Sequence, residues 1–339
     1  DAIAVHPRLE LFTLITGMHL VTGTWREVLE AGFTHGAKVP MQRSGHDGRE
    51  ADVQALARGI AGIGRVLAQT QPEVVLVLGD RIEALAAACA ASVGGVHLAH
   101  LHGGDRAEGV ADEAVRHAIS KLAHLHLPAT RQSQRRLIRM GEDPRWVQQV
   151  GSPALDALHA LEPQAGGPDL IVLQHPVGAT PAQEKHWMQE TLAALDAFPQ
   201  LQRLVLAPNH DPGHRGIRAA LRQARIPVME HLPRLQFLGC LLGAQAIVGN
   251  SSAGLIEAAA LRIPCVNIGP RQAGRERPNH VIDCTYGRRA VQHALAQALA
   301  LPRAGLRHPY GDGRTGARVA DWLAQLPLQQ VPLRKQNTY

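Results

Sequence analysis

Short apolar runs rich in β-branched residues alternate with helix-like segments along the whole chain, and most runs end in glycine or a polar turn. The clearest stretch begins at Val74–Leu78, turns at Gly79-Asp80-Arg81, forms an alanine-rich helical segment over Ile82–Ala91 and reaches a second run at Val96–Leu101. Predominantly apolar runs of this length are typical of strands buried on both faces of a parallel sheet. The pattern therefore predicts an α/β fold with parallel sheets flanked by helices.

The same alternation starts again after a segment rich in proline and glycine. We expect a first Rossmann-like domain over residues 1–161, a linker at 162–168 and a second Rossmann-like, nucleotide-binding domain over 169–314. An amphipathic helix and tail over 315–339 can pack back on the first domain. Two such domains would face each other across a cleft.

The pattern places further elements on both sides of the linker. Strands are expected at 9–16, 124–128, 170–173, 203–207, 227–230, 246–248 and 265–268, with another ending at Val150. Helices are expected at 51–70, 132–140, 154–161, 183–198, 216–224, 232–242 and 255–261, with another beginning at Asp112.

The first residues are typical of the end of a helix. A nucleotide-binding α/β domain usually begins with a strand and a glycine-bearing loop before its first helix. Because Asp1–Val5 resembles the tail of that helix, the expected first strand and its loop lie outside these 339 residues. Residues 20–50 are expected to form an irregular loop beside the cleft.

Composition narrows the class of protein. A chain of 339 residues with 45% hydrophobic residues can bury two cores, and no apolar run is long enough to span a membrane. The four cysteines show no CxxC pairing, which favours a reduced, cytoplasmic compartment. A net charge of +6 permits an anionic partner, but scattered arginines and 3% aromatic residues argue against a nucleic-acid groove.

Acidic side chains gather at the predicted strand ends of the first domain. Asp80 and Asp105 follow two neighbouring strands, and Asp112-Glu113 opens the next helix. In parallel sheets, ligands bind beyond the carboxyl ends of the strands. Carboxylates gathered at one cleft shift one another's pKa values apart and can supply an acid and a base, although surface acids at a helix start explain Asp112 and Glu113 equally well.

Histidines precede this acidic segment, and they leave a metal site conceivable. His100 and His102 are expected to share one strand face, and Asp105 follows them. A zinc site needs at least three well-placed protein ligands. We therefore expect core or substrate-contacting histidines and no metal.

The second domain carries a strand-to-helix turn suited to phosphate. Gly249-Asn250-Ser251-Ser252 precedes a helical segment whose amides and serine hydroxyls can hold an anion, and Glu257 one turn later suits a ribose. A simply capped helix is the alternative. Arg271, Arg275 and Arg277 follow the next strand, and His210 lies in a strand-end loop.

Several of these motifs occur together and in a characteristic order. The set resembles the hydrolysing UDP-N-acetylglucosamine 2-epimerases of the sialic-acid and legionaminic-acid type, on Gly79-Asp80-Arg81, His100-Leu101-His102-Gly103-Gly104-Asp105, Asp112-Glu113 with Arg116-His117, Gly249-Asn250-Ser251-Ser252 with Glu257, and Asn267 to Arg275. The resemblance covers nearly the whole chain.

The resemblance implies a GT-B fold and an enzyme that converts UDP-GlcNAc and water to UDP and N-acetylmannosamine. It proceeds through a glycal, without a metal or other cofactor, in sialic-acid and cell-surface polysaccharide biosynthesis. A nucleotide-sugar partner and a homo-oligomer, dimer or tetramer, are also implied. The implied catalytic residues are Asp80, His102, Asp105, Asp112 and Glu113, and the implied substrate-binding residues are Arg81, His117, His210, Gly249, Asn250, Ser251, Ser252, Glu257 and Arg271.

Three rival functions stay open at this point. They are a non-hydrolysing UDP-GlcNAc 2-epimerase, a GT-B glycosyltransferase and an inactive nucleotide-sugar-binding protein. The sequence leaves the amino sugar, and the choice between UDP and GDP, undecided.

Overall fold

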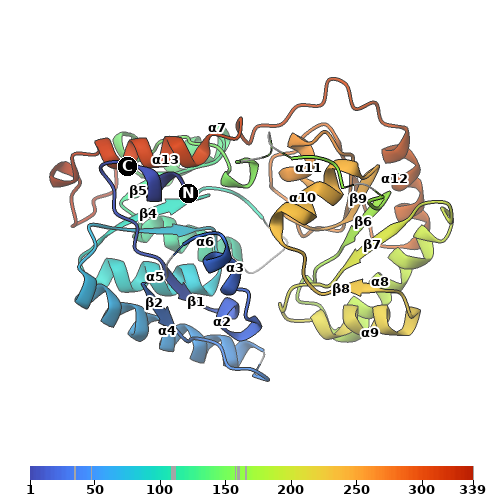
Figure 1. Cartoon of the computed structure of the whole chain (residues 1–339), viewed down its shortest axis with the longest axis horizontal. Helices are drawn as coiled ribbons and strands as arrows, with labels where there is room; N and C mark the ends of the chain where they lie inside the picture. Colours follow the sequence, from blue (N-terminus) through green and yellow to red (C-terminus); the bar gives the residue numbers. More distant parts are fainter. Residues whose placement is uncertain are drawn as a thin grey trace. The chain divides into compact units, whose positions relative to one another are not determined.

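The computed structural model describes residues 1–33, 36–46, 48–107, 112–156, 158, 161–164 and 166–338 (Figure 1). Two compact units divide the chain. Unit 1 comprises Asp1–Asp105, Ala111–Pro153 and Arg314–Tyr339, and unit 2 comprises Arg106–Val110 and Ala154–Gly313. The expected linker at 162–168 packs within unit 2, where Gln164 N–H donates to the Gly239 carbonyl at 3.2 Å. The change of unit therefore falls at Pro153, before the segment rich in proline and glycine.

The strands of unit 1 are all parallel but fall into two sheets. β1 (Leu14–Thr16) pairs with β2 (Ala37–Val39), and β4 (His97–Leu101) lies between β3 (Val74–Leu78) and β5 (Leu125–Leu127). Among the described residues, one edge of β1 and one edge of β3 carry no strand partner. The prediction of a strand ending at Val150 is wrong, because this segment forms a single isolated β-bridge, between Val147 and His126.

Helices surround the central sheet of unit 1. One apolar core joins β3 and β4 to α4 (Arg49–Thr70) and α5 (Ile82–Val93), and a second joins β4 and β5 to α13 (Thr315–Gln325). Strand alternation explains this division, because Leu98 faces the first core and Ala99 the second. The remaining helices and 3₁₀ turns of unit 1 are α1 (Ala2–Val5), α2 (Met18–Thr22), α3 (Arg26–Glu30), α6 (Asp112–Leu122), α7 (Arg131–Arg139), η1 (Pro144–Trp146) and η5 (Leu328–Gln330).

Two sequence expectations fail where the elements are short. Residues 20–50, expected to be irregular, contain α3 and β2, each too short to show a hydrophobic period. The helix expected over 154–161 is a 3₁₀ turn, η2 (Pro153–Leu155), and part of that range lies outside the described residues.

The C-terminal tail fastens onto unit 1 through buried polar groups. His97 and His124 bond to the carbonyl oxygens of Val331 and Leu333 at 3.0 and 3.1 Å. Lys335 forms an ion pair with Glu142, which is fully buried. Hydrogen bonds from His126 and Lys121 also favour the ionised carboxylate, and the pKa of Glu142 falls to about 2 despite its burial.

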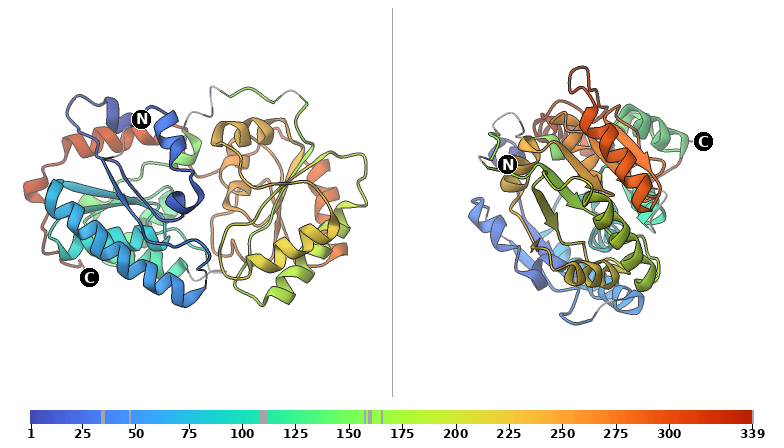
Figure 2. Two further views of the ribbon diagram at one scale, coloured as in Figure 1. Left: turned by 60° about the horizontal axis from the view of Figure 1, so that its bottom comes forward. Right: turned by 90° about the vertical axis from the view of Figure 1, so that its right-hand side faces the viewer.

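Unit 2 contains one six-stranded parallel sheet in the order β11-β10-β9-β6-β7-β8 (Figure 2). Its strands are β6 (Leu170–Leu173), β7 (Arg203–Leu206), β8 (Val228–Met229), β9 (Ala246–Gly249), β10 (Cys265–Ile268) and β11 (Val281–Cys284). Its helices are α8 (Pro181–Leu195), α9 (His214–Ala224), α10 (Arg234–Gly243), α11 (Glu257–Ala260) and α12 (Arg288–Ala300), with a 3₁₀ turn η4 (Ser252–Gly254). The sequence reading did not include β11 and α12.

The strand order of unit 2 indicates where ligands bind in sheets of this topology. It is the order of a doubly wound Rossmann sheet, whose topology reverses between the first and fourth strands, here β6 and β9. The core on one face joins the sheet to α8, α9 and α12. The carboxyl ends of β6 and β9 lie next to each other, since Leu173 pairs with Gly249.

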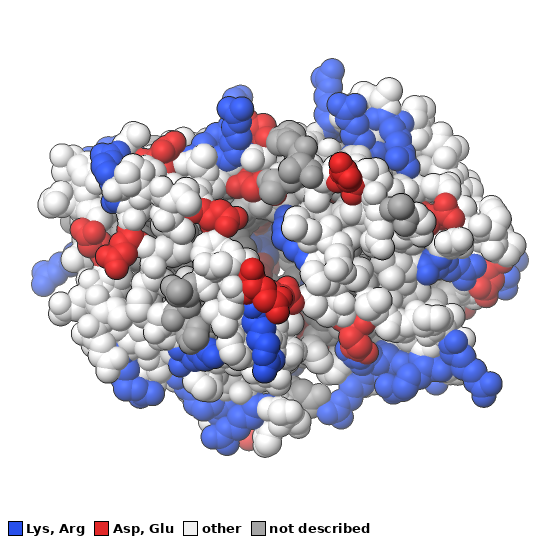
Figure 3. Space-filling view, in the orientation of Figure 1, with Lys and Arg blue, Asp and Glu red and all other residues white. Residues whose placement is uncertain are grey.

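Charged side chains of both signs lie on the face shown in Figure 3, and basic ones gather where α9 lies. The exposed arginines of this region include Arg215 and Arg222. No helix in the described part of the chain is long and apolar enough to cross a membrane.

Leu98→Ala should destabilise unit 1 by about 2–5 kcal/mol, because Leu98 is fully buried in the centre of β4 and its loss leaves a cavity. Urea-induced unfolding followed by fluorescence measures the change. Leu76→Ala is the matched control, since Leu76 on β3 is 39% exposed. An equal decrease in the free energy of unfolding for Leu76→Ala and Leu98→Ala would contradict the assignment of the core.

Candidate active site and nucleotide-binding turn

A buried arginine joins the two acidic strand ends of unit 1. Arg116 on α6 is 2% exposed and forms an ion pair with Asp80, which follows β3. Its guanidinium also donates to Glu113 Oε2 at 3.0 Å and to the Asp105 carbonyl oxygen at 3.1 Å. The structure therefore brings together Asp80, Glu113 and Asp105, as the sequence predicted for strand ends at one edge of a sheet.

A neighbouring histidine completes the contacts of Glu113. His117 lies one helical turn later on α6, with Nε2 3.2 Å from Glu113 Oε1. The side chains of Asp80 and Glu113 remain 21% and 25% exposed, so both carboxylates can reach a bound molecule. Arg81, by contrast, is an exposed residue at the N-cap of α5. Asp112 begins α6, but its side chain lies outside the described part of the chain.

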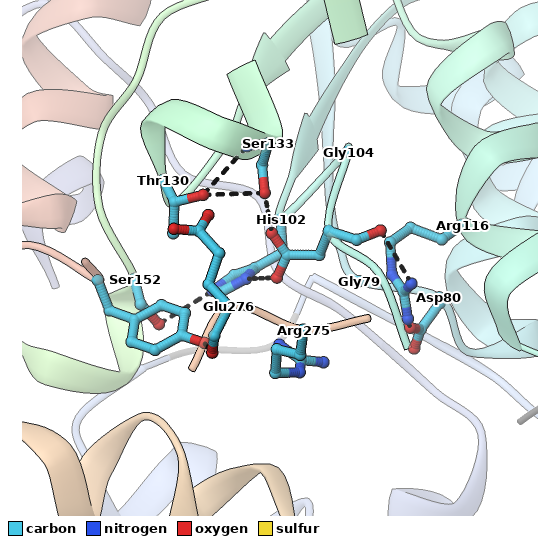
Figure 4. Close-up of polar contacts among 12 residues, drawn as sticks. Gly79, Asp80, His102, Gly104, Arg116, Thr130, Ser133, Ser152, Arg275 and Glu276 are labelled. Carbon is cyan, nitrogen blue, oxygen red and sulfur yellow. Dashed lines mark hydrogen bonds and ion pairs between the residues drawn. The ribbon is translucent and has the colours of Figure 1, made fainter. Parts of the chain in front are cut away.

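A second group of hydrogen-bonded polar side chains lies at the end of β4 (Figure 4). His102 Nδ1 is 2.9 Å from Asp105 Oδ2, and His102 Nε2 is 2.9 Å from Ser152 Oγ. Ser133 Oγ donates to the other carboxylate oxygen of Asp105 at 2.7 Å. Both ring nitrogens of His102 are therefore engaged, and both oxygens of Asp105 accept hydrogen bonds.

The backbone conformation after β4 allows these hydrogen bonds. His102 has φ of +62°, a left-handed conformation that is uncommon for residues other than glycine, although histidine, asparagine and aspartate adopt it more often than most. Gly104 approaches α7 so closely that a Cβ atom there would lie 2.5 Å from the Ser133 carbonyl oxygen. This close approach brings Ser133 to Asp105, and the turn directs His102 away from the strand.

The structure corrects the expectation that His100 and His102 share a face. β4 ends at Leu101, so the alternation of side chains no longer applies to His102. His100 is fully buried, with Nε2 2.7 Å from the Gly79 carbonyl oxygen and Nδ1 3.1 Å from Ser120 Oγ. Burial lowers the pKa of His100 to about 4, which makes it a neutral core residue. Among the described side chains, no three His, Cys, Asp or Glu groups converge on a metal position.

In unit 2, Gly249 and Asn250 build the turn at the end of β9. A Cβ atom at Gly249 would lie 2.0 Å from the Leu173 carbonyl oxygen, so a glycine is required where β9 passes β6. Asn250 is 1% exposed, accepts from His175 N–H at 2.7 Å and donates to the His175 carbonyl at 2.8 Å. Asn250 therefore links the ends of the two strands at the topological switch point.

The segment after Asn250 differs from the expected helix over 255–261. Ser252–Gly254 is a 3₁₀ turn capped by Ser251, whose Oγ accepts from Ala253 N–H at 3.3 Å, and α11 spans only Glu257–Ala260. The glycine and serine residues favour a turn over a long helix here. Ser251 and Ser252 remain partly exposed beside this turn.

The arginines after β10 have different partners. Arg271 NH1 and Gln272 Nε2 donate to the Asn250 carbonyl at 3.3 and 2.9 Å, which ties their loop to the turn after β9. Arg277 instead bonds to Asp283 Oδ2 at 3.0 Å, and Arg275 to Gln272 Oε1 at 3.0 Å. Arg271 therefore contacts the turn after β9 directly, and Arg275 bonds to Gln272, which contacts the same carbonyl.

The strand-end loop after β7 lies beside the same turn. Asn209 N–H donates to His175 Nδ1 at 3.1 Å, and Asp211 lies 3.8 Å from Arg271. His210 is exposed and forms an edge contact with the ring of His214. Partial burial and the positive neighbours His214 and Arg218 lower the pKa of His210. Glu257 is 12% exposed and lies 3.6 Å from Arg234, so an ion pair already engages it.

Comparison with known proteins places the chain in a family. The profile described as UDP-N-acetylglucosamine 2-epimerase matches residues 1–324, which include both sets of polar groups. The chain belongs to the UDP-N-acetylglucosamine 2-epimerase family. A relative from Legionella pneumophila, UDP-N,N'-diacetylbacillosamine 2-epimerase (hydrolyzing), is 36% identical over 350 residues, 98% of this chain and 92% of the relative. A UDP-N-acetylglucosamine 2-epimerase from Neisseria meningitidis serogroup B is 30% identical over 91% of this chain and 85% of its own length.

Solved structures of the family share the fold. The UDP-GlcNAc 2-epimerase from Neisseria meningitidis bound to UDP-GlcNAc has a TM-score of 0.79 at 18% identity, covering 96% of this chain and 94% of that one. The S. aureus MnaA structure with UDP has a TM-score of 0.77 at 17% identity, covering 100% and 94%. The predicted family and the α/β fold of GT-B type are thereby confirmed.

Several polar residues of these sites were not among the predicted ones. They are Arg116 as the centre of the acidic group, Ser133 and Ser152 on either side of the His102 pair, and His175 and Gln272 around Asn250. Arg116 stood within a quoted motif, and Ser152 follows a glycine in a predicted strand-end turn. Ser133 carries no sequence signal, because its role depends on how α7 packs on Gly104.

Gly249→Ala should unfold unit 2 at a lower urea concentration than Gly287→Ala. Both glycines have positive φ, 143° and 125°, but only at Gly249 would the added Cβ overlap a neighbouring atom. The overlap should cost about 1–3 kcal/mol beyond the shared backbone strain. Urea-unfolding midpoints measure the difference, and equal midpoints would show that β9 and β6 tolerate a side chain between them.

Proposed function

We propose that this chain is a hydrolysing 2-epimerase of a UDP-linked 2-acetamido sugar. The observation that carries the proposal is the Asp80–Arg116–Glu113 group at the strand ends of unit 1, in a chain 36% identical to a hydrolysing 2-epimerase. Epimerisation at C2 requires a base that removes one hydrogen, and two partly exposed carboxylates held by one guanidinium provide it.

The proposed reaction has two stages. A carboxylate, Asp80 or Glu113, takes the C2 proton while the C1–O bond breaks, and the bonding electrons leave with UDP. This elimination leaves a glycal with a C1–C2 double bond. Water then adds its oxygen to C1, and C2 receives a proton from the opposite face. UDP-GlcNAc and water would thus give UDP and N-acetylmannosamine.

The groups of unit 2 suit the leaving diphosphate. The C2 proton is weakly acidic, so negative charge on the departing phosphate needs stabilisation as the C1–O bond breaks. Ser251, Ser252 and the amides of their turn supply donors, and Arg271 beside Asn250 supplies a positive charge. We assign Glu257 to the ribose hydroxyls and His210 to the nucleotide side.

Two sugars deserve testing. UDP-GlcNAc is the substrate that the family description favours, and the Legionella relative favours UDP-N,N'-diacetylbacillosamine. A further relative from Escherichia coli, polysialic acid biosynthesis protein P7, is 27% identical over 85% of this chain. We therefore infer a role in the biosynthesis of sialic-acid-type sugars for the cell surface. We propose that the reaction takes place in the cytoplasm and that the enzyme is a homo-oligomer.

Release of free UDP without a sugar acceptor separates the alternatives. A hydrolysing enzyme releases UDP and a free 2-epimer, whereas a non-hydrolysing epimerase leaves UDP on the sugar. A glycosyltransferase needs an acceptor, and an inactive binding protein changes nothing. Incubation with each nucleotide-sugar, followed by chromatography of nucleotide and sugar, distinguishes the hydrolysing epimerase and the non-hydrolysing epimerase from the two alternatives that leave the nucleotide-sugar unchanged.

In D₂O, the released N-acetylmannosamine should carry deuterium at C2, and Glu113→Gln should slow its formation by about 10²–10⁴-fold, the usual contribution of a general acid or base. Proton NMR of the product measures both the label and the rate.

Asp143→Asn is the control for Glu113→Gln. Asp143 is also a carboxylate of unit 1 that forms an ion pair with an arginine, Arg145. It is distant from Glu113 in the sequence, and it caps η1. The Asp143→Asn variant should form N-acetylmannosamine at the wild-type rate. Retention of the original C2 hydrogen, or release of unepimerised N-acetylglucosamine, would exclude proton removal at C2.

Glu257→Ala should weaken UDP binding by about 1.5–3 kcal/mol, the value of a hydrogen bond to a charged group, without unfolding the protein. Isothermal titration with UDP measures the affinity. Asp196→Ala is the matched control, because Asp196 also pairs with an arginine of unit 2, Arg203, at an exposed position. An unchanged affinity in Glu257→Ala would remove this residue from the nucleotide site.

A further inference from the structure

The hydrogen-bonded side chains around His102 include a serine, Ser152, to which the proposed mechanism gives no role. Ser152 lies in the loop between Val150 and η2 and is fully buried, yet its hydroxyl is 2.9 Å from His102 Nε2. A fully buried hydroxyl cannot serve as a nucleophile for a nucleotide-sugar. Any role in the reaction would be indirect, and His102 is a hydrogen-bond partner through which it can act.

The partners of the histidine determine which nitrogen carries the proton. Asp105 receives a hydrogen bond from Ser133 Oγ on one oxygen and contacts His102 Nδ1 with the other. A carboxylate that accepts at both oxygens places the ring proton on Nδ1. Nε2 then has a free lone pair, and the Ser152 hydroxyl can donate to it.

We propose that Ser152 is a positioning residue of the epimerase reaction: its hydroxyl donates to His102 Nε2 and holds the ring as the Nδ1-protonated tautomer, with Nδ1–H directed at Asp105. This inference rests on the proposed function, in which His102 and Asp105 belong to the acid–base groups. Asp105 in turn fixes the orientation of the ring through Nδ1–H, as the aspartate does in other serine–histidine–aspartate arrangements.

The backbone supports this assignment. The left-handed conformation of His102 and the close packing of Gly104 on α7 set the ring between the two partners. Sparsely populated backbone conformations persist only where surrounding contacts determine them, and they cluster at functional sites. His102 is 12% exposed and Asp105 6%, so the pair lies at the edge of the protein interior.

The test compares Ser152→Ala with Ser120→Ala. Ser120 also is fully buried in unit 1 and bonds to a histidine, His100, at 3.1 Å, so both variants lose one serine–histidine hydrogen bond. In Ser152→Ala, kcat should fall about tenfold, the effect of one lost hydrogen bond, while KM stays unchanged. In Ser120→Ala, kcat should stay unchanged.

NMR of ¹⁵N-histidine-labelled protein reads the tautomer directly. The chain has 19 histidines, and the spectrum of His102→Gln identifies the His102 signals by their absence. Wild-type protein should show a protonated Nδ1 and an unprotonated Nε2, and Ser152→Ala should move both signals towards a mixture of tautomers. Ser120→Ala should leave them in place.

Each contrary result has a distinct meaning. A proton on Nε2 in the wild-type protein, or an unchanged spectrum and kcat in Ser152→Ala, overturns the role of Ser152 while UDP release by the wild type still supports the epimerase. A wild-type protein that releases no UDP from either nucleotide-sugar overturns the proposed function and, with it, the catalytic part of this inference. The NMR result then still decides the tautomer.

Discussion

The guanidinium of Arg116 is the interaction on which the arrangement in unit 1 depends. It is almost fully buried and bonds to two carboxylates and to the carbonyl oxygen of Asp105. A buried charge is stable only when it is paired and its donors are satisfied. Removing it would take the shared arginine partner from both Asp80 and Glu113. Arg116 therefore links the ends of β3 and β4 to α6, and it holds the carboxylates of Asp80 and Glu113 in place.

Unit 2 solves a different problem with backbone groups. The ends of β6 and β9 come so close that only glycine fits at position 249, and Asn250 satisfies the backbone of His175 in both directions. The loop carrying Arg271 is then tied to the carbonyl of Asn250. In the proposed function, the acids of unit 1 are assigned to the sugar and the donors of unit 2 to the diphosphate.

Sequence patterns predicted long elements and strand-end residues well, and short or packing-dependent features poorly. Parallel strands such as Val74–Leu78 are apolar throughout because both faces are buried, so their position is readable. The three-residue β2, and the four-residue α11 where a helix over 255–261 was expected, are too short to show a hydrophobic period. Ser133 reaches the Asp105 carboxylate through the packing of α7 on Gly104, which leaves no local signal in the sequence.

Asp105 explains why the two polar groups of unit 1 act as one. Its carbonyl oxygen accepts from Arg116, and its carboxylate accepts from Ser133 and contacts His102. A movement of the backbone at this residue therefore displaces the guanidinium and the imidazole together. Because Gly104 fixes that backbone against α7, the geometry of both proton-carrying groups depends on a helix that contributes no reactive side chain itself. The precision of the site is therefore set by packing around one turn.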